Sequence, residues 1–308
     1  MTENRQPQEA TDVRDVTRRK VVVVGAGAVA AVGLGGSAFA ADALTGEEVT
    51  QKPVPGEDCY QLTTETTEGP YYIDADKIRR DVTEDKEGIP LLLDLKVIDN
   101  ETCKPVRNAA VDIWHCDAVG VYSGYQDVGN GGGGPVPTGA PTGIPTGPPP
   151  GGGGGHQEPT DDTRYLRGTW RTDRHGHVAF RTVFPGWYQG RCVHIHVKVH
   201  VGGEWTDAGY EGGNTCHTGQ FFFDEESVLA SALLEPYASN TVERTTLDRD
   251  SIYDGSGTQG GLLRLRYRKD DIGRGVQGSI TVGVDPEATN DGQGGGPRPS
   301  TSASPSAS

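Results

Sequence analysis

Hydrophobic and polar positions alternate most clearly in the segment from Cys192 to Val201. Successive side chains of a β-strand point to opposite faces, so the odd-numbered positions here share one apolar face, which predicts a core-facing strand. These positions are Val193, Ile195, Val197, Val199 and Val201. His194 and His196 share the other face, about 6–7 Å apart along the strand, where both imidazoles can converge on one metal ion. The alternative is two polar residues on a solvated face.

Similar short segments, rich in Val, Ile and Phe and bounded by Gly, Pro, Asp or Asn, recur along the chain and predict further strands. They are Leu91–Ile98, Ala109–Trp114, Val178–Phe184, Gly219–Phe223, Leu262–Tyr267 and Ser279–Val284. Only Glu225–Glu235 has apolar residues at helical spacing. About seven strands and one helix predict an all-β fold, an antiparallel β-sandwich with long loops and one short helix.

The N-terminal region has the pattern of an export signal. Thr17-Arg18-Arg19-Lys20 precedes a run without charge, Val21 to Ala41, which contains the cleavage pattern Ala38-Phe39-Ala40. We therefore expect residues 1–40 to be a twin-arginine signal peptide and the mature protein to be secreted. The alternative is an uncleaved segment that anchors the protein, because about 20 apolar residues can span a bilayer.

Composition divides the rest of the chain. Residues 41–57 are polar and read as a linker, and residues 58–286 carry the strand pattern of one β-sandwich domain. Residues 129–155 contain thirteen Gly and seven Pro, so we expect a disordered insertion that cannot offset its ordering entropy by burial. Residues 287–308 form a second segment of this kind, a disordered tail.

Charge restricts the choice of partner. The net charge is −15, and without residues 1–40, which carry five basic and four acidic side chains, it is −16. A chain of this sign with no basic patch is a poor ligand for nucleic acid, whereas a small neutral substrate is compatible with it. We expect contact with a membrane only through the export signal. The oligomeric state is not readable from the sequence.

Five cysteines in an exported protein suggest disulfides. They are Cys59, Cys103, Cys116, Cys192 and Cys216. Two bridges and one free thiol are expected, and the sequence does not fix the pairing. A bridge between Cys192 and Cys216 is the favoured pair. The alternative for Cys192, which shares a strand face with His194, is a third metal ligand.

Three segments carry a family signature in chain order. They are Thr67-Glu68-Gly69-Pro70-Tyr71-Tyr72, the stretch from Val111-Asp112-Ile113-Trp114-His115-Cys116 to Tyr122-Ser123, and Phe184-Pro185-Gly186-Trp187-Tyr188 followed by Arg191, His194 and His196. Together they resemble the intradiol ring-cleavage dioxygenases, in particular the secreted branch related to catechol and protocatechuate dioxygenases. The resemblance covers about Cys59 to Val284.

The resemblance implies a non-haem Fe(III) cofactor held by Tyr122, Tyr188, His194 and His196. These donors suit the ion, because Fe(III) is hard and prefers anionic oxygen to thiolate. A phenol has a pKa of about 10, which a bound trivalent cation lowers toward neutrality. The implied reaction takes a catechol-type substrate and O2, and cleaves the ring between the two hydroxylated carbons to give a cis,cis-muconate-type product.

Further roles follow from the same resemblance. Tyr188 is both a ligand and a catalytic residue, because it leaves the metal and accepts a substrate proton. Arg191 is expected to stabilise negative charge on the ring. Tyr71, Tyr72 and Trp187 are expected to bind the substrate. The alternative is aromatic packing at the edge of the sandwich for one of the two tyrosines, and covering of the turn for Trp187. Two rival functions remain open: a cupin-like metal enzyme, and a secreted non-catalytic β-sandwich that binds aromatic polymer or carbohydrate.

Overall fold

The computed structural model describes residues 62–74, 77–130, 157–290 and 292. The predicted export signal 1–40 and linker 41–57 lie outside the described residues, as do 131–155 of the insertion and most of the tail 287–308. No helix within the described part of the chain has the length and apolar character needed to cross a membrane.

The strands fall into two four-stranded sheets and a small hairpin. The first sheet has the order β4-β1-β10-β9 and the second has the order β3-β2-β5-β8. In chain order the strands are β1 (Pro90–Asp99), β2 (Ala110–Trp114), β3 (Arg167–Arg171), β4 (His177–Val183), β5 (His194–Val201), β6 (Glu204–Trp205), β7 (Tyr210–Glu211), β8 (Asn214–Phe222), β9 (Arg264–Tyr267) and β10 (Val276–Val284). The strands β6 and β7 pair as the separate hairpin.

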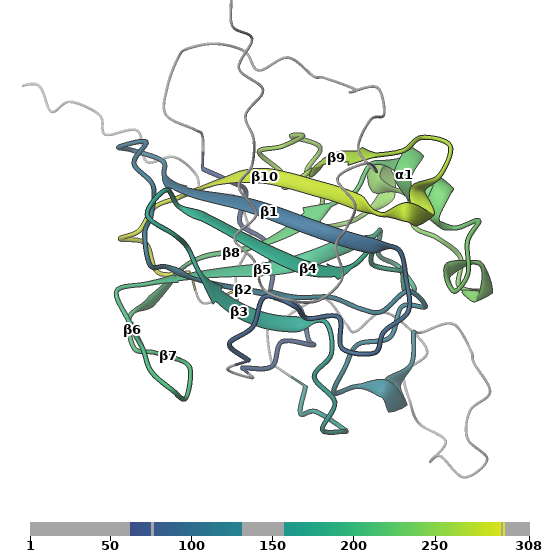
Figure 1. Ribbon diagram of the computed structural model, residues 1–308, viewed down its shortest axis with the longest axis horizontal. Coiled ribbons are helices and arrows are strands. Elements are labelled where there is room, and N and C mark those ends of the chain that lie inside the picture. Colours follow the sequence, from purple (N-terminus) through teal and green to yellow (C-terminus); the bar gives the residue numbers. More distant parts are fainter. Residues whose placement is uncertain (1–61, 75–76, 131–156, 291, 293–308) are drawn as a thin grey trace, which may run out of the picture. The chain divides into compact units, whose positions relative to one another are not determined.

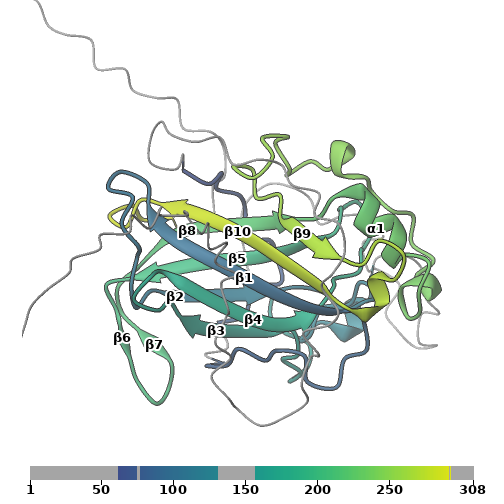
Figure 2. The same cartoon turned by 45° about the horizontal axis from the view of Figure 1, so that its top comes forward.

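The two large sheets lie face to face, as Figures 1 and 2 show, and this confirms the predicted β-sandwich. Most strand pairs are antiparallel, as expected. The exception among the described pairs of named strands is β1 with β10, which runs parallel from Leu91 opposite Val276 to Asp99 opposite Val284. A parallel pair requires a crossover connection, and here nearly the whole domain connects β1 to β10.

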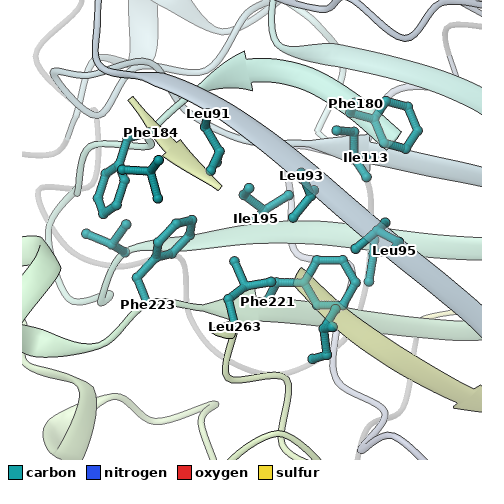
Figure 3. Close-up of a cluster of buried hydrophobic side chains, with 14 of the residues drawn as sticks. Leu91, Leu93, Leu95, Ile113, Phe180, Phe184, Ile195, Phe221, Phe223 and Leu263 are labelled. Atoms are coloured by element: carbon teal, nitrogen blue, oxygen red, sulfur yellow. The ribbon is translucent and has the colours of Figure 1, made fainter. Parts of the chain in front are cut away.

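The space between the sheets is filled by alternate residues of their inner faces. Figure 3 shows β1 contributing Leu91, Leu93 and Leu95 from one sheet, while Ile195 of β5 and Phe221 of β8 meet them from the other. All five are at most 1% exposed. The odd-numbered positions of the central segment thus face the core as predicted, with Val201 only partly buried at its end.

Helical structure is sparse among the described residues. The helix α1 covers Glu225–Ser231 and is capped by Asp224, whose carboxylate accepts a hydrogen bond from the backbone N–H of Ser227 at 2.8 Å. It ends earlier than predicted, because a turn bond from Leu234 N–H to the carbonyl of Ser231 replaces the helical pattern. The 3-10 helices are η2 (Gln126–Val128), η3 (Tyr237–Ser239), η4 (Leu247–Arg249) and η5 (Ile272–Arg274).

The outer face of the second sheet is buried as well, although sandwiches commonly expose it. The strand registers place four side chains in one row across β3, β2, β5 and β8: Arg167, Trp114, His196 and Gln220. Each is only 1–2% exposed. The segment 62–73 covers this face, with Thr66 N–H donating to the carbonyl of Thr218 at 2.9 Å. A covered polar face is where this fold can hold a site shielded from water.

The cysteine prediction is wrong in the number of bridges and in the favoured pair. Cys116, Cys192 and Cys216 are free and buried, whereas Cys103 is disulfide-bonded, so the expected second bridge is absent from the described residues. The strand register explains why Cys192 and Cys216 do not pair. Cys216 lies in β8 opposite the junction of Val199 and His200, about seven to eight residues or roughly 25 Å along the extended chain from Cys192. A disulfide requires Cα atoms within about 7 Å.

Candidate metal centre

Four donor atoms converge on the covered face of the second sheet. His194 Nε2 lies 3.1 Å from His196 Nε2, 3.4 Å from the Tyr122 hydroxyl and 3.3 Å from the Tyr188 hydroxyl. His196 Nε2 lies 3.1 Å from the Tyr122 hydroxyl. The structure therefore brings together the four residues that the resemblance implied as ligands, from one strand and two separate loops.

Strand β5 supplies both imidazoles, and its backbone orients the first of them. His194 Nδ1 donates to the carbonyl of Cys192 at 2.7 Å. A carbonyl can only accept, so the proton is on Nδ1 and the lone pair of Nε2 faces the other donors. Burial, together with the nearby positive charge of Arg191, lowers the pKa of His194 to about 3, so the ring is neutral. A neutral imidazole is the form that binds a metal.

His196 is held differently. Its Nδ1 atom is buried and has no hydrogen-bond partner among the described residues. Packing fixes the ring instead: Trp114 stacks on it with centroids 4.8 Å apart and planes 9° from parallel. Gly69 closes the edge, since a Cβ added there would lie 3.2 Å from His196 Cε1, and its φ of +74° is one that favours glycine.

Tyr122 is carried by the loop after β2, and glycine at position 120 lets this loop approach the loop that carries Tyr188. Gly120 has φ +87°, and a Cβ there would lie 2.2 Å from the carbonyl oxygen of Trp187. Arg167 then fastens the Tyr122 loop, because its Nε and Nη2 atoms donate to the hydroxyl and carbonyl of Ser123, each at 2.8 Å. The guanidinium carbon lies 6.0 Å from the centre of the Tyr122 ring.

Both phenols are disfavoured as anions in this setting. Burial raises the pKa of Tyr122 and of Tyr188 well above the ordinary value, although Arg191 acts in the opposite direction on both. A phenolate at either position therefore needs a cation in direct contact.

The four donors fit a ferric ion. Donors bound at about 2 Å to one tetrahedrally ligated metal lie about 3.3 Å apart, which matches the observed separations of 3.1–3.4 Å. Two imidazoles and two potential phenolates combine nitrogen with hard anionic oxygen, the preference of Fe(III). The described residues hold no cluster of three or more His, Cys, Asp or Glu side chains able to bind a metal, so a centre here depends on the tyrosines.

Arg191 lies beside the donors in a fixed orientation. Its Nε donates to Asp250 at 2.9 Å and its Nη2 to the side-chain oxygen of Gln220 at 2.5 Å. The Arg191 side chain is 14% exposed and that of Asp250 is fully buried. Asp250 also accepts from the backbone N–H of Cys192 at 2.8 Å, and so supports the residue whose carbonyl orients His194. Sequence analysis gave no role at the site to Asp250, Gln220 or Trp114, although Trp114 lies in the second signature segment.

The three aromatic residues expected to bind substrate lie in different places. Tyr71 packs beside the donors, with its ring centre 4.8 Å from that of Tyr122 and 6.5 Å from that of Tyr188. Tyr72 instead packs on Trp114 at 4.8 Å. Trp187 belongs to the core between the sheets, and its Nε1 donates to the carbonyl of Val242 at 2.8 Å. The position of Tyr72 favours aromatic packing, and the position of Trp187 in the core favours a structural role over contact with substrate.

A buried ion pair fastens the segment that carries Tyr71. Lys198 of β5 pairs with Glu68, and their side chains are 7% and 3% exposed. The Lys198 ammonium also lies 3.8 Å from the centre of the Tyr72 ring. Glu68 precedes Gly69, so this pair holds the segment against His196.

We expect Lys198→Met to lower the free energy of unfolding by about 3–5 kcal/mol, because it leaves the Glu68 carboxylate buried without its cation. Chemical denaturation measures this loss. Adding Glu68→Gln to Lys198→Met should restore part of the stability. Lys269→Met is the control: its pair with Glu226 is exposed and spans 3.9 Å, so the change should be below about 1 kcal/mol. Equal losses in the two lysine variants would contradict this account of the segment.

Comparisons with known proteins identify the family of the chain. A family model described as Dioxygenase matches residues 67–131. The crystal structure of an intradiol ring-cleavage dioxygenase from Tetranychus urticae is 30% identical, covers 76% of this chain and 98% of its own, and superposes with a TM-score of 0.60. A second dioxygenase structure is also 30% identical, covers 75% of this chain and 97% of its own, and gives a TM-score of 0.59. The curated proteins contain no match.

The chain belongs to the intradiol ring-cleavage dioxygenases, enzymes that open catechol-type aromatic rings. This family is known for non-haem Fe(III), and a catechol-type substrate and O2 fit it. Membership of the family counts against the two rival functions, a cupin-like metal enzyme and a non-catalytic binding module.

Proposed function

We propose that this protein is a ferric enzyme in which Tyr122, Tyr188, His194 and His196 hold one non-haem Fe(III). It takes a catechol-type substrate and O2 and cleaves the ring between the two hydroxylated carbons to a cis,cis-muconate-type product. The observation that carries the proposal is the convergence of two imidazole nitrogens and two phenol oxygens at 3.1–3.4 Å on a buried face. A ferric ion there would bind the catechol oxygens and activate the ring toward O2.

The chain's own residues divide the remaining work. Tyr188 is only partly buried, whereas Tyr122 is 3% exposed and is enclosed by Arg167 and Tyr71. We therefore assign to the Tyr188 phenolate oxygen, which would be anionic beside a ferric ion, the role of accepting a proton from a substrate hydroxyl and becoming the neutral phenol. Arg191 favours the phenolate form that can accept this proton, because its positive charge acts to lower the pKa of Tyr188 against the effect of burial.

Arg191 also stabilises negative charge on the aromatic ring of the substrate. A guanidinium fixed by Asp250 and Gln220 cannot swing away, so its charge is already in place when negative charge develops on the substrate. Tyr71 supplies an aromatic wall next to both tyrosines, against which a flat substrate can be oriented. The face is covered by the segment 62–73, which limits the access of water to the reacting atoms.

Export through the twin-arginine pathway is a further part of the proposal. It is supported by Arg18-Arg19 ahead of the uncharged run and by the small-x-small pattern ending at Ala40. The pathway carries folded proteins, so iron can be inserted before export. N-terminal sequencing of protein recovered outside the cell should begin at Ala41. Retention of residues 1–40 on a membrane would support the anchored alternative.

The visible spectrum of the purified protein tests the metal proposal. We expect a broad tyrosinate-to-iron absorption band in the blue-green, one iron per chain, and a shift of the band to longer wavelength on anaerobic addition of catechol. Admission of O2 should then yield a cis,cis-muconate-type product. A protein that stays colourless after loading with ferric iron would overturn the proposal, as would a product cleaved outside the two hydroxylated carbons.

A further inference from the structure

A small polar cavity lies on the outer face of the second sheet, beside the metal centre. It encloses about 10 Å³ and is lined by Lys77, Asp112, Trp114, Arg167 and Thr169, together with Ile73 and Gly168. That volume is about the room that one water molecule needs. Its lining comes from β2 and β3, with Ile73 and Lys77 on the remaining side.

Two buried donors in this lining have no partner among the described residues. Trp114 Nε1 and Arg167 Nη1 are both solvent-inaccessible and unbonded, and their residues are 1% and 2% exposed. The other nitrogens of Arg167 are committed to Ser123. An unsatisfied buried donor costs about 1–3 kcal/mol, so two around one cavity indicate a shared ligand.

Asp112, on a third side of the cavity, supplies a hydrogen-bond acceptor. Asp112 is partly buried and accepts from the Thr169 hydroxyl at 3.1 Å. Its carboxylate interacts electrostatically with Arg167. A water molecule satisfies this set, because it can accept from Trp114 and Arg167 and donate to Asp112. A small anion fits less well, since it would lie against the carboxylate.

We propose that this cavity holds one structural water, bonded to Trp114, Arg167 and Asp112, and that the three residues position the metal centre through it. The inference rests on the proposed metal centre. Trp114 acts on His196, whose ring is fixed by stacking in place of a hydrogen bond at Nδ1. Arg167 acts on Tyr122, because it clamps the neighbouring Ser123.

The orientation of two of the metal ligands, His196 and Tyr122, thus depends on the same bound water. Rotation of the indole is limited when Nε1 is bonded, so the plane that supports His196 is fixed. Residues that hold a metal ligand in place without binding the metal themselves typically change the metal affinity by about 10–100-fold when they are removed. His194 is outside this arrangement, because the Cys192 carbonyl orients it.

A high-resolution crystal structure of the full protein tests the water directly. We expect one ordered water within hydrogen-bond distance of Trp114 Nε1, Arg167 Nη1 and the Asp112 carboxylate. An empty cavity, or an anion in it, would overturn the assignment.

The variant Trp114→Phe tests the positioning role, because phenylalanine keeps an aromatic ring beside His196 and removes the donor. Iron binding should weaken about tenfold and the tyrosinate-to-iron band should shift. Trp205→Phe, at a tryptophan of the β6–β7 hairpin away from the cavity, should change neither. Asp112→Asn, which leaves Trp114 in place, should shift both in the same direction by less and covers the case in which Trp114→Phe does not fold.

The outcomes separate the two proposals. If the wild-type protein binds no iron, the proposed function fails. If the wild-type protein binds iron with the expected band, while Trp114→Phe and Asp112→Asn retain its affinity and spectrum, the positioning role fails and the proposed function stands.

Discussion

His196→Ala and His194→Ala should each be purified without iron and without the visible band. Each substitution removes one of four converging donors. Loss of a residue that only supports a ligand lowers metal affinity by up to about 100-fold, so loss of a ligand should lower the apparent affinity for ferric iron by more than that. Iron content by elemental analysis and absorption after loading with ferric iron measure the loss. Activity should fall with the iron content.

Two comparisons make this result specific. His175→Ala removes an exposed histidine from the turn before β4 and should keep full iron content and colour. Tyr188→Phe should retain most of the iron while its band shifts or bleaches and turnover falls, because two histidines and Tyr122 remain as ligands. Full iron retention in both histidine variants would exclude the proposed ligand set.

The sequence predicted those side chains of the candidate site that are marked by a pattern within a short segment. Strict alternation over Val193–Val201 fixes which face of β5 is apolar, and it thereby places His194 and His196 together on the other. The tyrosines at 122 and 188 were identified from motif spacing within short segments. The structure brings their hydroxyls to the same point, a placement that depends on two loops and on the contact at Gly120.

The supporting residues gave no local signal of their role. Asp250 lies 58 residues from Cys192, whose N–H it accepts, in a segment without a regular pattern. Trp114 reaches His196 only through the register of β2 on β5. The register of antiparallel strands is a tertiary property, since a shift of two residues keeps the same faces and changes every pair.

Strand β3 is an element that the sequence analysis did not predict at all. Its sequence, Arg-Gly-Thr-Trp-Arg, lacks an apolar alternation. Its outer face carries Arg167, which is buried, and Thr169, which is partly buried, and both line the polar cavity. A strand that presents polar groups to a buried site therefore departs from the usual pattern of a strand with one solvated face.

The second large effect concerns the support of Arg191. Asp250→Asn should reduce kcat by about 100-fold at nearly full iron content, with a smaller change in KM. Asparagine loses the charge that holds Arg191 Nε and provides fewer acceptors for the backbone N–H groups of Cys192, Ile252 and Tyr253. A displacement of about 1 Å in a positioned group is enough for a loss of this size. Asp254→Asn, four residues on, changes a carboxylate bonded to Ser256 and Thr64 and should leave kcat unchanged.

Stability should respond with a defined pH dependence. The bonds from Arg191 and Cys192 hold the pKa of Asp250 well below its ordinary value despite burial. A carboxyl with a lower pKa in the folded state stabilises the fold fully above its unfolded pKa of about 3.9, and this contribution is lost as the pH falls through the folded pKa. The stability difference between the wild-type protein and Asp250→Asn should therefore be constant between about pH 5 and 8 and shrink below about pH 4. A difference that stays unchanged at pH 3 would contradict the proposed charge pairing.

A double-mutant cycle separates the two roles of this pair. Asp250→Asn alone leaves the Arg191 guanidinium without its buried anion, which should cost about 3–5 kcal/mol of unfolding free energy. In the double variant with Arg191→Met no unpaired charge remains, so stability should recover relative to the sum of the single changes. Activity should not recover, because the group that stabilises negative charge on the ring is gone. If activity returned together with stability, Arg191 would be a structural residue and its catalytic assignment would have to be withdrawn.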